Sequence, residues 1–166
     1  TISTSLAADV TFTAWIKPDF DYTEEVPRNI VSWRISRLGK IILGKHNTGK
    51  FYFVHDSQDF GGVWTCVDYL HPFSAGEWIH VAGTREGNTL RLYINGRLVK
   101  TAVNDGIKTV TGSAPIRVSK GVWNTFYGII DETRIYNRAL TADEIKELYE
   151  GQQTALSLTK SASPHF

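Results

Sequence analysis

Between Gly128 and Gly151 the spacing of apolar residues changes, and this change constrains the fold more than any other feature of the sequence. From Gly128 to Tyr136, β-branched and aromatic side chains alternate with polar ones, which is typical of a long β-strand. Strict alternation places Ile130 and Tyr136 on one face of this strand and Ile135 on the other. The chain is therefore predicted to approach its C-terminal part as an extended strand.

A helix is predicted soon after this strand. Thr141 and Glu144 have the spacing of a capping box, in which the hydroxyl accepts from the Glu144 N–H and the carboxylate reaches back. Apolar residues then recur at helical spacing, and Gly151 is expected to end the helix. We therefore predict one short amphipathic helix near the end of an otherwise β chain.

The remaining sequence contains many short segments with strand-like alternation, separated by turns. In the strongest segment, 9–18, four apolar residues share one face and Trp15 lies on the other. Asn95 and Gly96 predict a tight type I′ hairpin. So many short strands indicate an all-β, two-sheet antiparallel β-sandwich. Further strands are predicted at 1–6, 29–34, 38–44, 51–54, 63–70, 78–85, 90–94, 98–103 and 116–119.

The chain is predicted to form one domain. Its 166 residues are enough to bury a core, and no linker, repeat or low-complexity block divides them. We assign residues 1–151 to the sandwich. Residues 152–166 are polar and lack a period, and they are expected to form a C-terminal tail or an extra edge strand.

Four segments together resemble one known family. They are 12–18, 78–84, 90–99 and the strand-to-helix stretch 128–144, in that order. This pattern is similar to the laminin-G-like jelly-roll domains of the concanavalin A-like lectin-glucanase superfamily, over roughly residues 9 to 150. The resemblance implies a concanavalin A-like jelly roll. It does not imply one function, because this fold serves many roles.

Composition excludes several classes of partner. The formal net charge is +1, so neither nucleic-acid binding nor an acidic partner is indicated. No apolar run is long enough to span a membrane, and no signal peptide is visible. Because the chain begins at Thr1, we expect a processed product or an excised segment. The single cysteine, Cys66, lies in a strand-like run and is expected to be a buried small hydrophobe.

No catalytic role is predicted. Retaining glycosidases carry two carboxylates about 5 Å apart, whereas Asp131 and Glu132 are strand neighbours and should point to opposite faces. No histidine has zinc-ligand spacing with another histidine or cysteine. The family resemblance implies a structural role for His80, which occupies a common position in the similar domains. The sequence also lacks a nucleophile elbow and a phosphate-binding glycine loop.

The five tryptophans are the best guide to a ligand site, because indole rings can stack on sugar rings. The family resemblance implies that Trp15 and Trp78 occupy strand positions that pack in the core, and Trp33 stays undecided. Trp64 and Trp123 follow or lie in polar loops and are expected to be exposed. We predict a carbohydrate site lined by Trp64 and Trp123 together with the polar residues Asp59, Asn124, Asp56 and Arg34.

The family resemblance also implies a structural calcium ion. Relatives often hold Ca²⁺ at a loop, and the resemblance assigns Asp131 as a ligand. Asp9, in the turn before the strand residues 12–18, could join it. Calcium prefers six to eight oxygen ligands, so further carbonyl or carboxylate groups would be needed.

Two functions remain open at this point. The first is a non-catalytic, lectin-like carbohydrate-binding module of a secreted or surface protein, with a glycan or polysaccharide as partner. The alternative is a structural or protein-adhesion domain of a larger surface or viral appendage protein, with a protein as partner. Both predict an extracellular or cell-surface location and neither requires membrane insertion.

Overall fold

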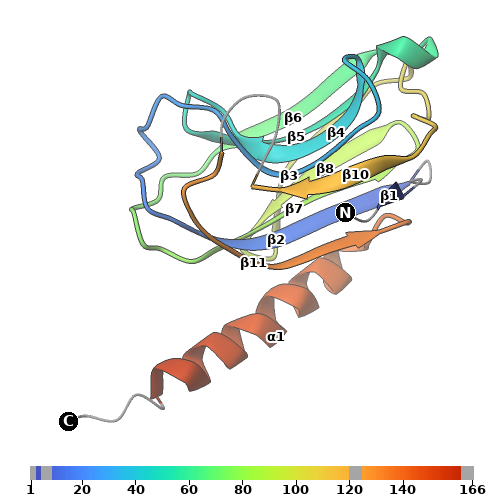
Figure 1. The fold of residues 1–166 in the computed structure, drawn as a ribbon. Helices are drawn as coiled ribbons and strands as arrows, with labels where there is room; N and C mark the ends of the chain where they lie inside the picture. The colour runs from blue at the N-terminus through green and yellow to red at the C-terminus, as the bar shows by residue number, and fades with distance from the viewer. Residues whose placement is uncertain (1–2, 5–8, 120–124, 162–166) are drawn as a thin grey trace.

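The computed structural model describes residues 3–4, 9–119 and 125–161. Two β-sheets face one another, and one helix lies beside the lower sheet of Figure 1. The sheets have the strand orders β1-β10-β3-β4-β5-β6 and β11-β2-β7-β8-β9. Every neighbouring pair is antiparallel, so the predicted two-sheet sandwich is confirmed.

The strand positions agree with the sequence prediction to within a few residues at their ends. A short 3₁₀-helix, η1 (Gln58–Phe60), follows the fifth strand, and α1 (Ala142–Ser161) follows the last. The strands are β1 (Ser3–Thr4), β2 (Val10–Pro18), β3 (Arg28–Arg34), β4 (Gly39–Lys45), β5 (Lys50–Ser57), β6 (Trp64–Leu70), β7 (Ile79–Glu86), β8 (Thr89–Ile94), β9 (Arg97–Val103), β10 (Ala114–Val118) and β11 (Gly128–Tyr136).

The core lies between the inner faces of the two sheets. Phe12 of β2 packs edge-on against Phe53 of β5, with ring centroids 6.1 Å apart. Trp33, which the sequence left undecided, is fully buried in the same cluster as Val31. Residues two positions apart on a strand share a face, so Trp33 belongs to the core and not to a ligand site.

A β-bulge corrects the predicted faces of β11. The register shifts between Asp131 and Arg134, and Glu132 takes a positive φ of 47°. The extra residue in β11 reverses the alternation from that point. Ile130 and Ile135 therefore both pack against the core, whereas strict alternation assigned them to opposite faces.

The capping box is confirmed. The Glu144 N–H donates to Thr141 Oγ1 at 3.2 Å, and the Thr141 N–H donates to Glu144 Oε2 at 2.9 Å. The predicted stop at Gly151 is wrong, because α1 continues to Ser161. One glycine costs a helix about 1 kcal/mol relative to alanine, which is too little to end it among helix-forming neighbours. Residues 152–161 are therefore helical and form no edge strand, and residues 162–166 lie outside the described residues.

The first half of α1 covers the outer face of the five-stranded sheet (Figure 1). A small apolar cluster joins Ala82 and Tyr93 of the sheet to Leu140 and Ile145. Trp15 is buried, as predicted, but beneath the helix, where its ring stacks on that of Tyr149. No helix in the described part of the chain is both long and apolar enough to span a membrane.

Candidate functional site

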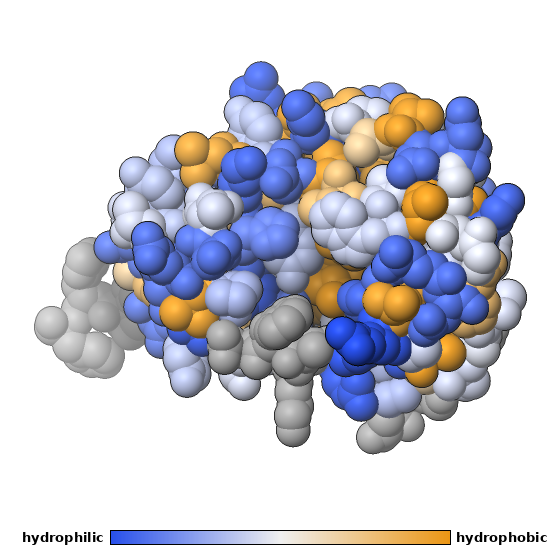
Figure 2. All heavy atoms as spheres, turned by 90° about the horizontal axis from the view of Figure 1, so that it is seen from above, coloured by the Kyte–Doolittle hydropathy of each residue, from blue (hydrophilic) through white to orange (hydrophobic). Residues whose placement is uncertain are grey.

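The outer face of the six-stranded sheet carries an apolar strip. Alternate residues of β4, β5 and β6 point away from the core, and the register places Ile42 beside Val54 and Val54 beside Cys66. With Tyr52 these side chains form a cluster separate from the core. Figure 2 looks onto this side of the molecule and shows hydrophobic residues between hydrophilic borders. This strip is the floor of a groove, which we call the outer groove.

The outer groove has a volume of about 430 Å³, within the usual range of small-molecule sites. Trp64 stands at its border with 50% of its surface exposed. The other residues that line it are Pro27, Lys40, Ile42, His46, Asn47, Tyr52 and Val54. The groove thus combines an accessible indole, an apolar floor and several polar groups that could bind hydroxyls.

The polar groups of the outer groove are held in place by one another. The Tyr52 hydroxyl donates to Asn29 Oδ1 at 2.9 Å, and its ring stacks on His46 with centroids 4.2 Å apart. Burial raises the pKa of Tyr52 well above its usual value, so the phenol stays protonated. Burial also lowers the pKa of His46, partly opposed by Asp68, which favours a neutral imidazole at pH 7.

Cys66 is half-buried within the apolar strip on the outer face of the six-stranded sheet. Burial raises the pKa of its thiol to about 12, with a smaller contribution from the charge of Asp68. The thiolate is the reactive form of cysteine, so this side chain is chemically inert at neutral pH. This agrees with the predicted role as a small hydrophobe.

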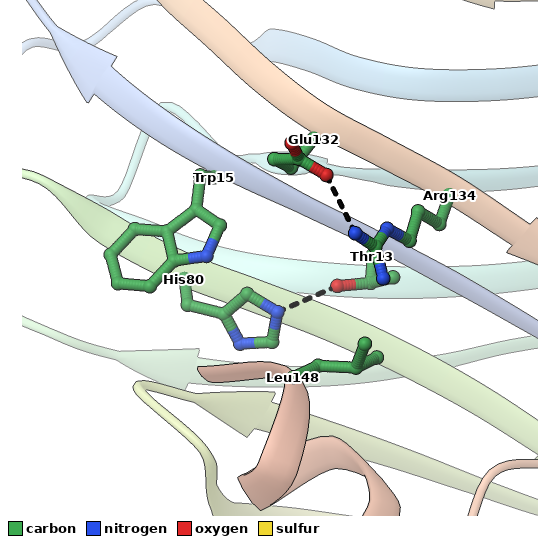
Figure 3. A pocket seen from close by; sticks show the side chains of 6 residues that line it. All are labelled: Thr13, Trp15, His80, Glu132, Arg134 and Leu148. Carbon is green, nitrogen blue, oxygen red and sulfur yellow. Dashed lines mark hydrogen bonds and ion pairs between the residues drawn. The ribbon is translucent and has the colours of Figure 1, made fainter. Parts of the chain in front are cut away.

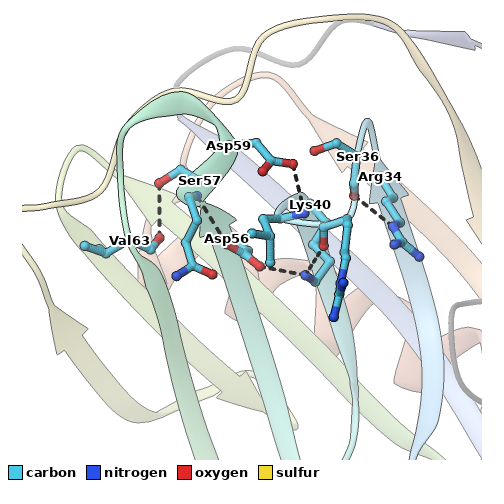
Figure 4. Close-up of polar contacts among 10 residues, drawn as sticks. Arg34, Ser36, Lys40, Asp56, Ser57, Asp59 and Val63 are labelled. Carbon is cyan, nitrogen blue, oxygen red and sulfur yellow. Dashed lines mark hydrogen bonds and ion pairs between the residues drawn. The ribbon is translucent and has the colours of Figure 1, made fainter.

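Asp56 lies next to Trp64, as predicted, but it is already paired. It faces Trp64 across β5 and β6, and its carboxylate accepts from Lys40 Nζ at 2.6 Å (Figure 4). Asp56 is almost completely buried, whereas Lys40 reaches the groove. The pair leaves this end of the groove without net charge, which suits a neutral ligand.

Asp59 and Arg34 stabilise a turn instead of lining the groove. The Leu38 N–H donates to Asp59 Oδ2 at 3.1 Å, and Arg34 Nε donates to the Ser36 carbonyl at 2.8 Å (Figure 4). Hydrogen bonding from Ser36, then Leu38, lowers the pKa of Asp59. The other predicted site residues, Trp123 and Asn124, lie outside the described residues.

Sequence reasoning missed His46, Asn47, Pro27 and Tyr52 as groove residues. The available signal was β5, where apolar side chains occupy both faces over Phe51–Val54. A strand that is apolar on both faces needs a cover on each side. The five-stranded sheet covers the inner face of β5, and the residues that line the outer groove flank its outer face.

The two predicted calcium ligands do not meet. Asp131 lies opposite Trp15 near the middle of β2, whereas Asp9 precedes Val10 at the start of β2. Five residues of strand at about 3.3 Å each put roughly 16 Å between Val10 and Trp15, far beyond the span of one calcium shell. Asp131 Oδ1 accepts from the Glu132 N–H at 2.8 Å, and Asp9 Oδ1 accepts from the Gly87 N–H at 2.8 Å.

Among the described residues, the carboxylates near Asp131 are already engaged. Its neighbour Glu132 is engaged by Arg134, with the carboxylate and guanidinium 2.7 Å apart. Within the part of the chain that the structure describes, no three His, Cys, Asp or Glu side chains gather as a metal-binding group. The residues present therefore do not fit a carboxylate-rich calcium site, and the calcium prediction rests on Asp131 alone.

A second polar pocket, under α1, is structural. His80 Nε2 lies 2.7 Å from Thr13 Oγ1, and Trp15, Glu132 and Arg134 surround the ring (Figure 3). The pocket has room for about 10 Å³, no more than one water molecule, so it cannot hold a sugar. Burial, then the charge of Arg134, lowers the pKa of His80 to about 4. A neutral, buried His80 is consistent with the structural role predicted for it.

The fold and the outer groove define a jelly-roll sandwich domain with one accessible outer face. A laminin-G-type family model, described as the concanavalin A-like lectin/glucanases superfamily, matches residues 2–146. The chain therefore belongs to this superfamily, which confirms the resemblance seen in the sequence. No curated protein sequence matches the chain.

Several solved structures share the fold. One is the CBM40 of the Ruminococcus gnavus IT-sialidase, bound to α2,3-sialyllactose (TM-score 0.69, 16% identity, 87% of this chain and 84% of that one). Another is domain 4 of AbnA, an extracellular arabinanase from Geobacillus stearothermophilus, with arabinotriose (TM-score 0.66, 24% identity, 87% and 68%). The receptor-binding domain of botulinum neurotoxin D also matches (TM-score 0.68, 18% identity, 90% and 38%). At these identities the likeness concerns the fold alone.

Proposed function

We propose that this domain is a non-catalytic carbohydrate-binding module of a secreted or surface protein, and that the outer groove holds the glycan. The observation that carries the proposal is the half-exposed Trp64 beside an apolar groove of about 430 Å³. A sugar ring has an apolar face that an indole can cover, while its hydroxyls need hydrogen-bonding groups at the edge of the ring. Trp64 supplies the first requirement.

The polar border of the outer groove supplies the second requirement. Lys40 is held by Asp56, and His46 is held by Tyr52, so neither has to be ordered when a ligand binds. Groups fixed before binding lose less conformational entropy on binding, which favours affinity. Because the charge of Lys40 is balanced by Asp56, we propose a neutral glycan for this groove.

The relatives in structure support this class of function. Two of the solved structures with this fold contain an oligosaccharide, namely sialyllactose and arabinotriose. Both belong to carbohydrate-active enzymes of which they are one part, and the arabinanase is extracellular. We propose the same setting for this domain, at the cell surface or outside the cell.

The experiment uses a glycan array that includes neutral arabino-, gluco- and galacto-oligosaccharides, followed by affinity measurement on the best ligand. We expect Trp64→Ala to weaken binding about tenfold or more, equivalent to about 1.4 kcal/mol. Val103→Ala removes another exposed apolar side chain on the other sheet and should bind normally. If Trp64→Ala and Val103→Ala bind the glycan with equal affinity, the outer groove is not the glycan site.

A protein-binding role is the second candidate. Ile129 is more than half exposed on β11, the edge strand of the five-stranded sheet, and so is Tyr127, which directly precedes this strand. Exposed apolar side chains on an edge strand are typical of protein contacts. Light scattering of the domain across a range of concentrations tests self-association, and loss of association in Ile129→Lys would support this candidate.

A further inference from the structure

A hollow on another side of the molecule has the features of a separate binding site. It has a volume of about 420 Å³ and lies where the end of β6 meets the β8–β9 hairpin. Tyr69 and His71 line one side, and Arg97 and Leu98 line the other. β6 and β9 are edge strands of the two sheets, so neither is covered there by a further strand of its own sheet. We call this hollow the edge pocket, and it shares no lining residue with the outer groove.

The hairpin that carries Arg97 is held firmly. Asn95 and Gly96 adopt the positive φ values of 49° and 73° that a type I′ turn requires. The Asn95 N–H donates to the His80 carbonyl at 2.8 Å, and Asn95 Oδ1 accepts from the His80 N–H at 2.9 Å. A Cβ on Gly96 would lie 3.0 Å from Tyr149 of α1, so the helix packs directly on the turn. The backbone of Arg97 is therefore fixed before any ligand arrives.

The edge pocket is positively charged. Arg97 is exposed, and within the described residues no carboxylate lies within 4.0 Å of its guanidinium. No Asp or Glu lines the pocket, although the charge of nearby Glu77 acts on His71. The lining therefore offers a guanidinium, a phenol, an imidazole and an amide as hydrogen-bond donors. Such a set matches a carboxylate, which a guanidinium can bind through two parallel hydrogen bonds.

The edge pocket also offers a surface for a ring. Tyr69 is 40% exposed and Leu98 48% exposed, and both line it. The volume and polarity of the edge pocket suit one or two sugar residues. We propose that the edge pocket binds an acidic sugar residue of a glycan, with the carboxylate on Arg97 and the ring against Tyr69. The domain then has two sites of different charge: a neutral outer groove and a cationic edge pocket.

The test uses trigalacturonate and its methyl ester as probes, with binding followed by calorimetry at low salt. Arg97→Gln should weaken binding of trigalacturonate at least tenfold, and Tyr69→Ala should weaken it severalfold. Lys100→Gln is the matched control, because it removes one exposed positive charge from the same strand, outside the pocket. Wild-type protein should bind the methyl ester much more weakly than the free acid.

These experiments test the edge pocket independently of the outer groove. Trp64→Ala should leave trigalacturonate binding unchanged, because Trp64 lines only the outer groove. The proposal is overturned if wild-type protein does not bind trigalacturonate, if Arg97→Gln and Lys100→Gln lose affinity equally, or if the methyl ester binds as well as the acid. Loss of trigalacturonate binding in Trp64→Ala would place the acid in the outer groove and also overturn it.

Discussion

The indole ring of Trp15 stacks on the phenol ring of Tyr149, with centroids 5.5 Å apart and planes inclined by 16°. One ring lies near the middle of β2 and the other in α1, 134 positions later in the chain. The contact places α1 on the outer face of the five-stranded sheet, whereas the outer groove lies on the six-stranded sheet.

Removal of the Tyr149 ring should destabilise the domain. We expect Tyr149→Ala to lower the free energy of unfolding by about 2 kcal/mol, because the stacking contact and part of the apolar cover of the sheet are lost. Urea unfolding followed by tryptophan fluorescence measures the change. Glu147→Ala alters an exposed residue of the same helix and should change stability by no more than about 0.5 kcal/mol. Similar stability of the two variants would show that the helix contributes little.

Stability should fall as the pH falls from 6.5 to 4. The pKa of His80 is about 4 in the folded protein, and the ordinary histidine value is 6.5. The unfolded chain therefore binds a proton in this window that the folded protein does not, and unfolding is favoured. Each pH unit costs at most about 1.4 kcal/mol from this residue. The stabilising contribution is complete above pH 6.5 and is lost progressively on acidification.

His80→Gln isolates this effect, because glutamine can still bond to Thr13 and does not titrate. Urea unfolding at pH 7.5, 6, 5 and 4 should give a shallower pH dependence for the variant than for the wild type. His55, whose pKa is lowered to about 3 by burial and then by Arg85, contributes in both proteins and cancels from the comparison. Identical slopes would mean that His80 binds protons equally in the folded and unfolded states, which would contradict the prediction.

The Tyr52 hydroxyl should contribute to stability through its buried partner. Tyr52→Phe leaves Asn29 Oδ1 buried without its donor, and the Asn29 amide nitrogen already has no partner among the described residues. We expect a loss of about 1–3 kcal/mol in the free energy of unfolding. Tyr69→Phe removes an exposed hydroxyl and should be nearly neutral. An equally small effect of both changes would indicate that solvent reaches Asn29.

Calcium binding at Asp131 remains a prediction from the family resemblance. Isothermal titration of EDTA-treated protein with CaCl₂, together with melting temperature, tests it. Heat of binding and a rise in Tm that Asp131→Asn abolishes and Asp9→Asn preserves would support a site at Asp131, since the register separates the two residues. No heat and no change in Tm would end the prediction.

Much of the fold could be read from local patterns. Alternation in β2 identified its core face, the capping box located the start of α1, and Asn95 with Gly96 located a hairpin. Each of these signals depends on residues a few positions apart, so the sequence contains them completely. The bulge at Glu132 was not visible, because it depends on pairing with β2, and it reversed the predicted faces beyond it.

The candidate site was only partly predictable. The sequence by itself determined the sandwich, its strands and the exposure of Trp64, because local periodicity and turn chemistry specify these. Only the tertiary structure decided that Trp64 borders a groove with His46 and Tyr52, that Asp56 is neutralised by Lys40, and that Asp9 and Asp131 lie apart. Such relations follow from strand register and sheet order, which bring together residues whose separation along the chain carries no periodic signal.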